Sequence, residues 1–310
     1  MVYNKKNIDY LLIDGTSHLY RAYYSFSSLS NKNGIPSGAI YGVINTLKKL
    51  VLEYPYSQII IAFDSPNKTF RHTLFQYYKI NRKMMPNNLK VQIKPLYRII
   101  KTIGFPIIIM PNFEADDIIG TLAHEANNKN KFTLISTNDK DLGQLVNSHT
   151  SILEMKSKKI LGEEEIKKKH GVIPTLIPDL FGLMGDKSDN IPGVSRIGEK
   201  TAICLLKKFG SLKNIYNNTD KISQCSFRGA KNIAKILIKN KTLAFLSQNL
   251  ATIKTDILMP KSINELKTSP ISTYELSYLF KYYDFHNWLR LLNQGEWLTN
   301  TSILKLYNKT

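Results

Sequence analysis

The stretch Asp9-Tyr-Leu-Leu-Ile-Asp14 is a short run of apolar residues that ends in an aspartate. Similar apolar runs lie at residues 57–64, 105–110 and 131–136. Continuous Ile, Leu and Phe runs are typical of strands that are covered on both faces. Between them, apolar residues recur at helical spacing, as in residues 40–51 and 96–103. This βαβ pattern predicts an α/β core with a mostly parallel sheet and flanking helices.

The chain changes character near residue 160, after which no further strand pattern is found. Short helical segments broken by Gly and Pro follow instead, near residues 163–170, 175–184, 199–208, 229–239 and 273–293. A length of 310 residues exceeds the usual size of one domain. We therefore expect two domains, an α/β core at residues 1–160 and a helical domain at residues 161–310.

The composition is strongly basic, with 43 Lys and Arg against 24 Asp and Glu and a formal net charge of +19. Such a charge favours a polyanionic partner, because cationic side chains neutralise phosphates and release counterions. The chain is also rich in Lys, Asn, Ile and Tyr, which the codon bias of an AT-rich genome produces as well. The charge alone therefore leaves both explanations open.

Other bulk features exclude some classes of protein. Hydrophobic residues make up 43% of the chain, enough for a buried core, but no apolar run is long enough for a transmembrane helix. The N-terminus has no apolar signal-peptide region that ends in a cleavage site. Cys204 and Cys225 have no metal-binding spacing and are expected to be reduced thiols. We expect a cytoplasmic protein that does not bind membranes.

Acidic residues follow the predicted strands. Asp14 ends the first run, Asp64 ends the second, and two aspartates, Asp139 and Asp141, follow the fourth. Ligands of open α/β sheets bind outside the carboxyl ends of the strands, so these side chains should meet at one edge. The third run is followed by a segment that opens a helix, and a second acidic pair lies further along the chain. These additional acids are Glu114, Asp116, Asp117, Asp186 and Asp189.

Nine carboxylates cannot share a pocket and all stay ionised unaided. Hard divalent cations solve this problem, and all-oxygen ligands select Mg²⁺ or Mn²⁺. Two such ions would activate water and stabilise the leaving oxygen in phosphodiester hydrolysis. No His or Cys partners these acids, which argues against zinc. A single Asp after a strand is more often a helix N-cap or a turn former, so the hypothesis depends on the joint pattern.

Three long motifs, at residues 113–117, 136–142 and 184–194, carry a resemblance to a known family. They resemble the 5′→3′ exonuclease (5′ nuclease) domain of bacterial DNA polymerase I, and more distantly the flap endonuclease superfamily. The resemblance begins at Leu11 and runs at least to Asp256. It implies a PIN/resolvase-like core with an arch at about residues 68–94. It also implies a helical domain with a helix-hairpin-helix DNA-binding segment at about residues 184–208.

The resemblance also implies roles for individual residues. Asp14, Asp64, Glu114 and Asp116 would serve one metal ion, and Asp139, Asp141 and Asp186 the other. Asp117 and Asp189 would act in the outer shell or through water. Arg21, Lys79 and Arg82 would act on the scissile phosphate and the 5′ strand, since fixed positive charge stabilises a phosphoryl transition state. The expected DNA contacts from the first half of the chain are Tyr20, Arg71 and Tyr78.

The segment 191–202 resembles the family's hairpin, which holds duplex phosphates without reading sequence. Gly193, Gly198, Lys200 and Thr201 fit that pattern, and potassium is a further candidate ion at the hairpin. Ser195 and Arg196 stand where the family usually has Pro and Gly. If that position needs a positive φ, Arg196 is strained there, or it adds a phosphate contact of its own. The arch has an alternative interpretation as a solvated basic helix.

These features predict a structure-specific 5′ nuclease of replication and repair. Its expected substrates are flapped, nicked or 5′-ended DNA and RNA–DNA duplexes, including RNA primers. We expect a monomer on the bacterial nucleoid, with a separate DNA polymerase and ligase as candidate partners. The chain is either a natural stand-alone protein or an excised domain. The alternatives are a catalytically impaired junction-binding protein and a PIN-type ribonuclease.

Overall fold

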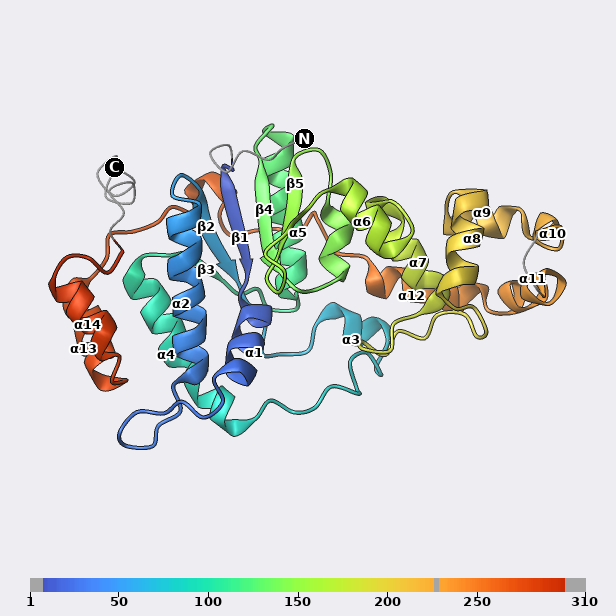
Figure 1. Ribbon diagram of the computed structural model, residues 1–310. Coiled ribbons are helices and arrows are strands. Elements are labelled where there is room, and N and C mark those ends of the chain that lie inside the picture. The colour runs from blue at the N-terminus through green and yellow to red at the C-terminus, as the bar shows by residue number, and fades with distance from the viewer. Residues whose placement is uncertain (1–7, 226–228, 299–310) are drawn as a thin grey trace.

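The structure is a computed structural model that describes residues 8–225 and 229–298. A six-stranded sheet in the order β3-β2-β1-β4-β5-β6 forms its centre (Figure 1). The strands are β1 (Tyr10–Asp14), β2 (Gln58–Ala62), β3 (Ile107–Ile108), β4 (Thr133–Thr137), β5 (Thr150–Glu154) and β6 (Ile160–Leu161). All neighbouring pairs are parallel except β5 and β6. The predicted mostly parallel α/β sheet is confirmed.

Two of these strands were not predicted. β5 contains only two large apolar residues, and its Thr150 and Ser151 are polar yet buried. β6 is a two-residue antiparallel edge. Neither gives the long apolar run by which the other strands were found, because tertiary pairing with β4 decides that β5 is a strand.

Each central strand sends alternate side chains to two different cores. Tyr10 and Leu12 of β1 pack on one side of the sheet, while Leu11 and Ile13 pack on the other. The first side is covered by α5 (Ala115–Asn128), and the second by α1 (Gly15–Ser25), α2 (Gly38–Glu53) and α4 (Asn87–Ile103). Burial on both faces explains why these strands are continuous apolar runs.

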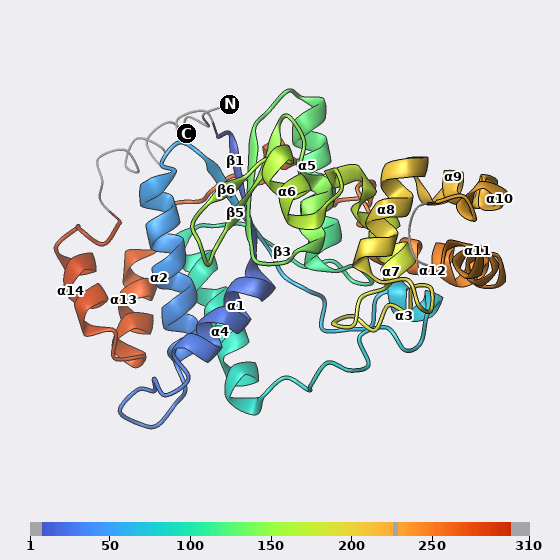
Figure 2. The ribbon, with the colours of Figure 1, turned by 45° about the vertical axis from the view of Figure 1, so that its right-hand side comes forward.

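A helical arm extends from one side of the sheet (Figures 1 and 2). It consists of α6 (Glu163–His170), α7 (Ile177–Met184), α8 (Glu199–Phe209), α9 (Leu212–Asn217), α10 (Thr219–Ile222), α11 (Ala230–Lys239) and α12 (Lys241–Ala251). Short 3-10 turns lie at Asp141–Leu145, Pro174–Leu176 and Ile263–Glu265. The predicted helices near residues 163–170, 175–184, 199–208 and 229–239 are confirmed.

The last described helices leave the arm and return to the α/β core. These are α13 (Thr273–Tyr282) and α14 (His286–Asn293), which lie on the far side of the sheet from α8–α11 (Figure 1). They join the core that also contains α2 and α4, and Trp288 and Trp297 are buried there. Residues 273–298 were predicted to belong to the helical domain at residues 161–310. They pack instead on the α/β core, apart from α6–α12. The boundary near residue 160 stays a prediction.

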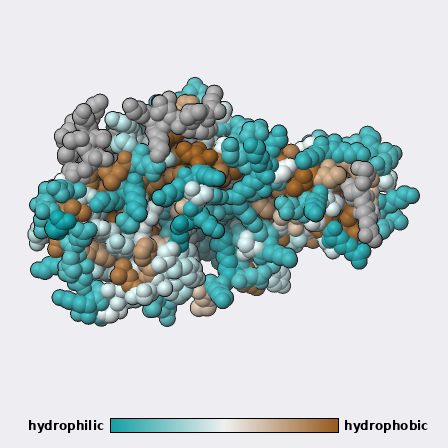
Figure 3. All heavy atoms as spheres, viewed as in Figure 1, coloured by the Kyte–Doolittle hydropathy of each residue, from teal (hydrophilic) through white to brown (hydrophobic). Residues whose placement is uncertain are grey.

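The surface in Figure 3 is predominantly hydrophilic, with scattered hydrophobic patches. Within residues 8–225 and 229–298, every helix is too short or too polar to cross a membrane.

The packing of α13 predicts a clear contrast between its two sides. Phe280 is fully buried and its ring contacts the rings of Phe285, Trp288 and Trp297. Phe280→Ala should lower the free energy of unfolding by about 3–5 kcal/mol, measured by urea denaturation. Tyr278→Ala, on the exposed side of the same helix, should change it by less than about 0.5 kcal/mol. Equal effects would mean that α13 does not dock on the core as described.

Candidate active site

Asp14 and Asp64 connect neighbouring elements at the carboxyl edge of the sheet. Asp14 is the N-cap of α1, because its Oδ1 accepts from Ser17 N–H at 2.9 Å, and its Oδ2 accepts from Thr137 Oγ1, at the end of β4, at 2.7 Å. Ala115 N–H, at the start of α5, donates to Asp64 Oδ1 at 2.8 Å. The strand-end acids therefore meet at one edge, as the sequence predicted.

A cleft of about 880 Å³ opens at this edge. Four of the predicted acids line it, namely Asp14, Asp64, Asp116 and Asp139. Lys79, Arg82 and Tyr20 line the same cleft, as predicted for residues beside the substrate. α4 also contributes Lys90, Lys94 and Tyr97, which were not among the predicted site residues. The signal that could have found them was their helical spacing, because Lys90 and Lys94 lie at the end of the predicted arch segment and Tyr97 follows it.

Four acids at this edge make no ion pair with any residue that the structure describes. Burial raises the pKa of Asp14 to about 7, although the hydrogen bonds from Ser17 and Thr137 oppose the shift. Burial and the neighbouring carboxylates also raise the pKa of Asp116, Asp139 and Asp141 above its ordinary value. Asp116 makes no hydrogen bond or ion pair with any described residue. Asp141 Oδ1 is likewise buried without a hydrogen-bond partner.

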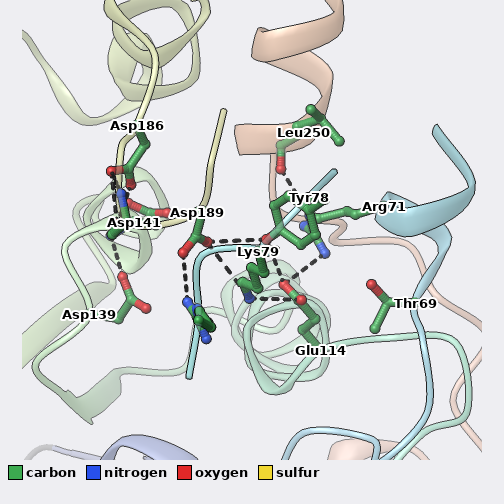
Figure 4. A network of polar contacts seen from close by, with 12 residues as sticks. Thr69, Arg71, Tyr78, Lys79, Glu114, Asp139, Asp141, Asp186, Asp189 and Leu250 are labelled. Carbon is green, nitrogen blue, oxygen red and sulfur yellow. Dashed lines mark hydrogen bonds and ion pairs between the residues drawn. The ribbon is translucent and has the colours of Figure 1, made fainter. Parts of the chain in front are cut away.

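Three other acids are held by cations (Figure 4). Lys79 Nζ lies 2.7 Å from Glu114 Oε1, and Arg82 Nη2 lies 2.7 Å from Asp189 Oδ1. Lys140 Nζ lies 2.9 Å from Asp186 Oδ2. Burial alone would raise the pKa of Glu114, but Lys79 and Arg71 outweigh it and lower that pKa. In the same way, Lys140 and Ser188 outweigh burial and lower the pKa of Asp186.

Arg71 and Asp117 form a buried, bidentate ion pair. Arg71 Nη1 and Nη2 lie 2.7 and 2.8 Å from the two oxygens of Asp117, and the exposed fractions of the two residues are 2% and 0%. Nε and Nη2 of Arg71 also donate to the carbonyl oxygens of Leu250 and Thr252. Burial alone would lower the pKa of Arg71, but Asp117 outweighs it and raises that pKa.

This pair bears on two predictions. Every nitrogen of the Arg71 guanidinium has a protein partner, so the guanidinium supports Asp117 in this arrangement, and its contact with DNA stays a prediction. The backbone amides of Glu114 and Lys254 also donate to Asp117, so each of its oxygens accepts two hydrogen bonds. These contacts leave little room for a metal ion directly on Asp117, and its role in the outer shell stays a prediction. The sequence could not show this pair, because Arg71 and Asp117 lie 46 positions apart.

Two other predicted residues lie outside the cleft. Tyr78 is buried, and its hydroxyl donates to Glu114 Oε2 at 3.1 Å and Asp189 Oδ2 at 3.2 Å. It therefore supports these acids, and we no longer expect it to contact DNA in this arrangement. Arg21 is exposed on α1 and is not among the residues that line the cleft.

Lys79 has an unusual backbone conformation. Its φ is 56°, in the left-handed region that non-glycine residues seldom adopt. Its N–H donates to the carbonyl oxygen of Asp189 at 2.9 Å, which fixes the turn against the segment 185–192. Strain of this kind persists where the surrounding structure holds it, and it often lies at functional sites.

The predicted hairpin lies at the base of the helical arm. Gly193 has a φ of 61°, packs against Gly185 and donates its N–H to Ser247 Oγ at 2.9 Å. Gly198 is the N-cap of α8, so Lys200 and Thr201 lie in the first turn of that helix. Arg196 is exposed with a φ of 64°. The concern raised by the sequence is therefore confirmed, because this position does require the left-handed region.

The donor chemistry at the edge of the sheet fits hard cations. Asp116 and Asp141 present carboxylate oxygens without partners, and oxygen ligands are those that Mg²⁺ prefers. Within the described ranges, however, no group of three or more His, Cys, Asp or Glu side chains could hold an ion as it stands. The acids line the cleft without converging on one point.

A parallel sheet with acids and cations at its carboxyl edge, joined to a helical arm, is the arrangement expected of a nuclease. Residues 9–171 match the 5′-3′ exonuclease N-terminal resolvase-like domain, and residues 172–274 match the 5′-3′ exonuclease C-terminal SAM fold. This chain belongs to the 5′-3′ exonuclease family, which confirms the predicted resemblance.

Individual proteins agree with this assignment. The 5′-3′ exonuclease of Buchnera aphidicola subsp. Baizongia pistaciae is 58% identical over 97% of this chain and 99% of that protein. DNA polymerase I of Pseudomonas aeruginosa is 42% identical over 90% of this chain but only 31% of its own length. A bacteriophage T5 flap endonuclease, described in a complex with DNA and metal ions, has the same fold. Its TM-score is 0.65 at 20% identity, over 78% of this chain and 88% of that one.

Adjacent acids on α5 should respond in opposite directions when they are neutralised. Asp116→Asn removes a buried charge that makes no ion pair with a described residue, so it should raise the free energy of unfolding at neutral pH in metal-free protein. Asp117→Asn removes the bidentate partner of the buried Arg71, whose other carboxylate neighbour is Glu114 at 3.3 Å, and should lower it by about 3–5 kcal/mol. Denaturant titrations of both variants measure these changes.

The pH dependence follows from the raised pKa of Asp116. Charged Asp116 destabilises the fold above its unfolded pKa of 3.8, so the contribution of this group to stability falls as pH rises from that value through its raised pKa in the folded chain. The gain from Asp116→Asn should therefore vanish near pH 3.8 and below, where the carboxyl is protonated in both states. A gain that persists unchanged in acid would show that charge crowding is not its cause.

The backbone of Arg196 predicts a stabilising substitution. Arg196→Gly should raise the free energy of unfolding by about 1 kcal/mol, because glycine adopts a φ of 64° without a Cβ clash. Arg196→Ala keeps the Cβ and should give no such gain, so it is the matched control. Thermal and urea unfolding of the three chains test this, and equal stabilities would contradict backbone strain at this position.

Proposed function

We propose that this exonuclease is a structure-specific 5′ nuclease that hydrolyses phosphodiester bonds at flaps, nicks and 5′ ends of DNA and RNA–DNA duplexes. The observation that carries the proposal is the cleft itself. Uncompensated carboxylates line it together with Lys79 and Arg82, so it offers both ligands for cations and positive charge for a phosphate. That combination suits phosphodiester cleavage.

The residues of the cleft would divide the work. Asp14, Asp64, Asp116, Asp139 and Asp141 would hold two divalent ions, Mg²⁺ or Mn²⁺, with Asp186 and Glu114 beside them. Such ions supply an activated water and Lewis-acid stabilisation of the leaving oxygen. Lys79 and Arg82 would bind the scissile phosphate, since both already line the cleft. Asp189 and Tyr78 would keep these cations and Glu114 in position through their hydrogen bonds.

The ion pairs of the cleft suggest how its side chains would rearrange when divalent ions bind. Lys79 and Arg82 are paired with Glu114 and Asp189, so in this state protein cations offset part of the negative charge. Divalent ions would take over that neutralisation. Lys79 and Arg82 would then be free to turn toward the phosphate, since about half of the Arg82 side chain is already exposed.

The helical arm would hold the duplex. The first turn of α8, with Lys200 and Thr201, presents free backbone amides, and such helix N-termini bind phosphates. The exposed Arg196 adds a positive charge beside it. We further propose that potassium binds at this hairpin, and that the chain acts as a monomer in the bacterial cytoplasm alongside a DNA polymerase and ligase.

A cleavage assay tests the proposal. A flapped DNA duplex should be cut with Mg²⁺ or Mn²⁺ and left intact in excess chelator. Asp116→Ala should lower the single-turnover rate about a thousandfold or more while flap binding persists, because affinity depends mainly on backbone electrostatics. Asp220→Ala, at an exposed acid of the helical arm, is the matched control and should cut at the parent rate.

The same assay separates the alternatives. Binding of the flap without cleavage under any metal condition would identify a junction-binding protein. Preferential cutting of single-stranded RNA would identify a PIN-type ribonuclease. Robust cleavage in chelator would refute the role of divalent ions.

A further inference from the structure

Helices α4 and α13 expose basic and aromatic side chains that the fold does not require. On α13, Tyr274 and Tyr278 are 89% and 58% exposed, while Leu276 and Phe280 on the opposite side are buried in the core. On α4, four basic residues at intervals of three or four positions are exposed. The α4–α13 face is defined by Lys90, Lys94, Arg98, Lys101, Tyr274 and Tyr278.

The two helices are neighbours that run in opposite directions. Ser272 N–H, just before α13, donates to the carbonyl oxygen of Thr102 near the end of α4 at 3.1 Å. About one turn before Thr102 on α4 and one turn after Ser272 on α13, Arg98 Nε donates to Glu275 Oε1 at 2.6 Å. The tyrosines of α13 therefore lie alongside the basic row of α4, and together they form one continuous surface.

This face begins at the active-site cleft. Lys90 and Lys94 line the cleft together with Asp64 and Asp116, and the basic row continues from them along α4. α13 lies at the end of the molecule opposite α8–α11 (Figure 1). A strand that leaves the cleft along this face would therefore run away from the hairpin end of the arm.

The chemistry of the face favours one kind of occupant. Lys90, Lys94 and Lys101 make no ion pair with any residue in the described ranges, so their charge is available to a polyanion. Exposed aromatic rings beside such charge are typical of sites for single-stranded nucleic acid, whose unpaired bases stack on them. A duplex hides its base faces, and a second copy of this basic surface would be repelled.

We propose that the α4–α13 face binds the single-stranded part of the nucleic-acid substrate where it leaves the cleft. The tyrosines stack on unpaired bases, and the lysines contact phosphates. The inference rests on the proposed function in one respect, because it takes the cleft as the place where the strand is cut.

A binding comparison tests the face directly. A labelled oligothymidine is titrated with the full chain in chelator, by fluorescence anisotropy. The double variant Tyr274→Ser/Tyr278→Ser should weaken binding at least about fivefold, because each base that no longer stacks on a tyrosine ring lowers the affinity. Lys101→Glu should also weaken it and reduce its salt dependence. Tyr56→Ser is the matched control, since Tyr56 is also 58% exposed but lies just before β2, and it should bind like the parent.

A cleavage comparison links the face to the substrate. The double variant should cut a nicked duplex without a flap at the parent rate, and should cut a long-flap substrate less efficiently at low enzyme concentration. Unchanged affinity for oligothymidine in both the double variant and Lys101→Glu would overturn the proposal. The proposal would also be overturned if sedimentation showed that the parent chain self-associates and that the double variant is monomeric, because the face would then bind a second copy of this chain. If the parent chain cuts neither substrate, the proposed function fails, while the binding titration still decides this inference.

Discussion

The accumulation of negative charge at one edge of the sheet is the constraint around which the rest of the site is arranged. Asp14, Asp64, Asp116 and Asp139 line one cleft, and Asp141, Asp186 and Asp189 lie close behind it. Like charges at such distances repel strongly where water is scarce. The folded chain accommodates this charge in two ways. Protein cations form ion pairs with some of the acids, and the other acids have a raised pKa.

The buried pair of Arg71 and Asp117 shows how the first solution supports the architecture. Arg71 lies on the short helix α3 (Phe70–Leu74), and Asp117 lies on α5. The remaining donors of Arg71 reach carbonyls at the end of α12 and just after it. A single guanidinium thus joins the start of the arch segment, the α/β core and the helical arm. Because breaking a buried pair leaves an uncompensated charge, the relative placement of these three parts depends on it. Asp117, predicted to act in the outer shell of the metal site, thus also has a structural role.

The uncompensated acids show the opposite balance between stability and function. Their charged forms oppose folding, and the positive charge of Lys79 only partly offsets the burial of Asp116 and the repulsion from its neighbouring carboxylates. A site kept in this state gains most from cations that arrive from solution. The left-handed backbone of Lys79, whose side chain is paired with Glu114, is a second feature of the same cleft that lowers stability.

The sequence by itself determined the parallel core, the helices of the arm and the place of the acids, and it marked Arg196 as a position that would be strained if its φ were positive. These features follow from local rules, since apolar runs end at Asp14 and near Asp64 and since parallel strands share one carboxyl edge. Only the tertiary structure decided that Arg71 neutralises Asp117, that β5 joins the sheet and that α13 returns to the core. Each of these depends on side chains or strands that meet from distant positions, and no local pattern specifies which cation reaches which acid.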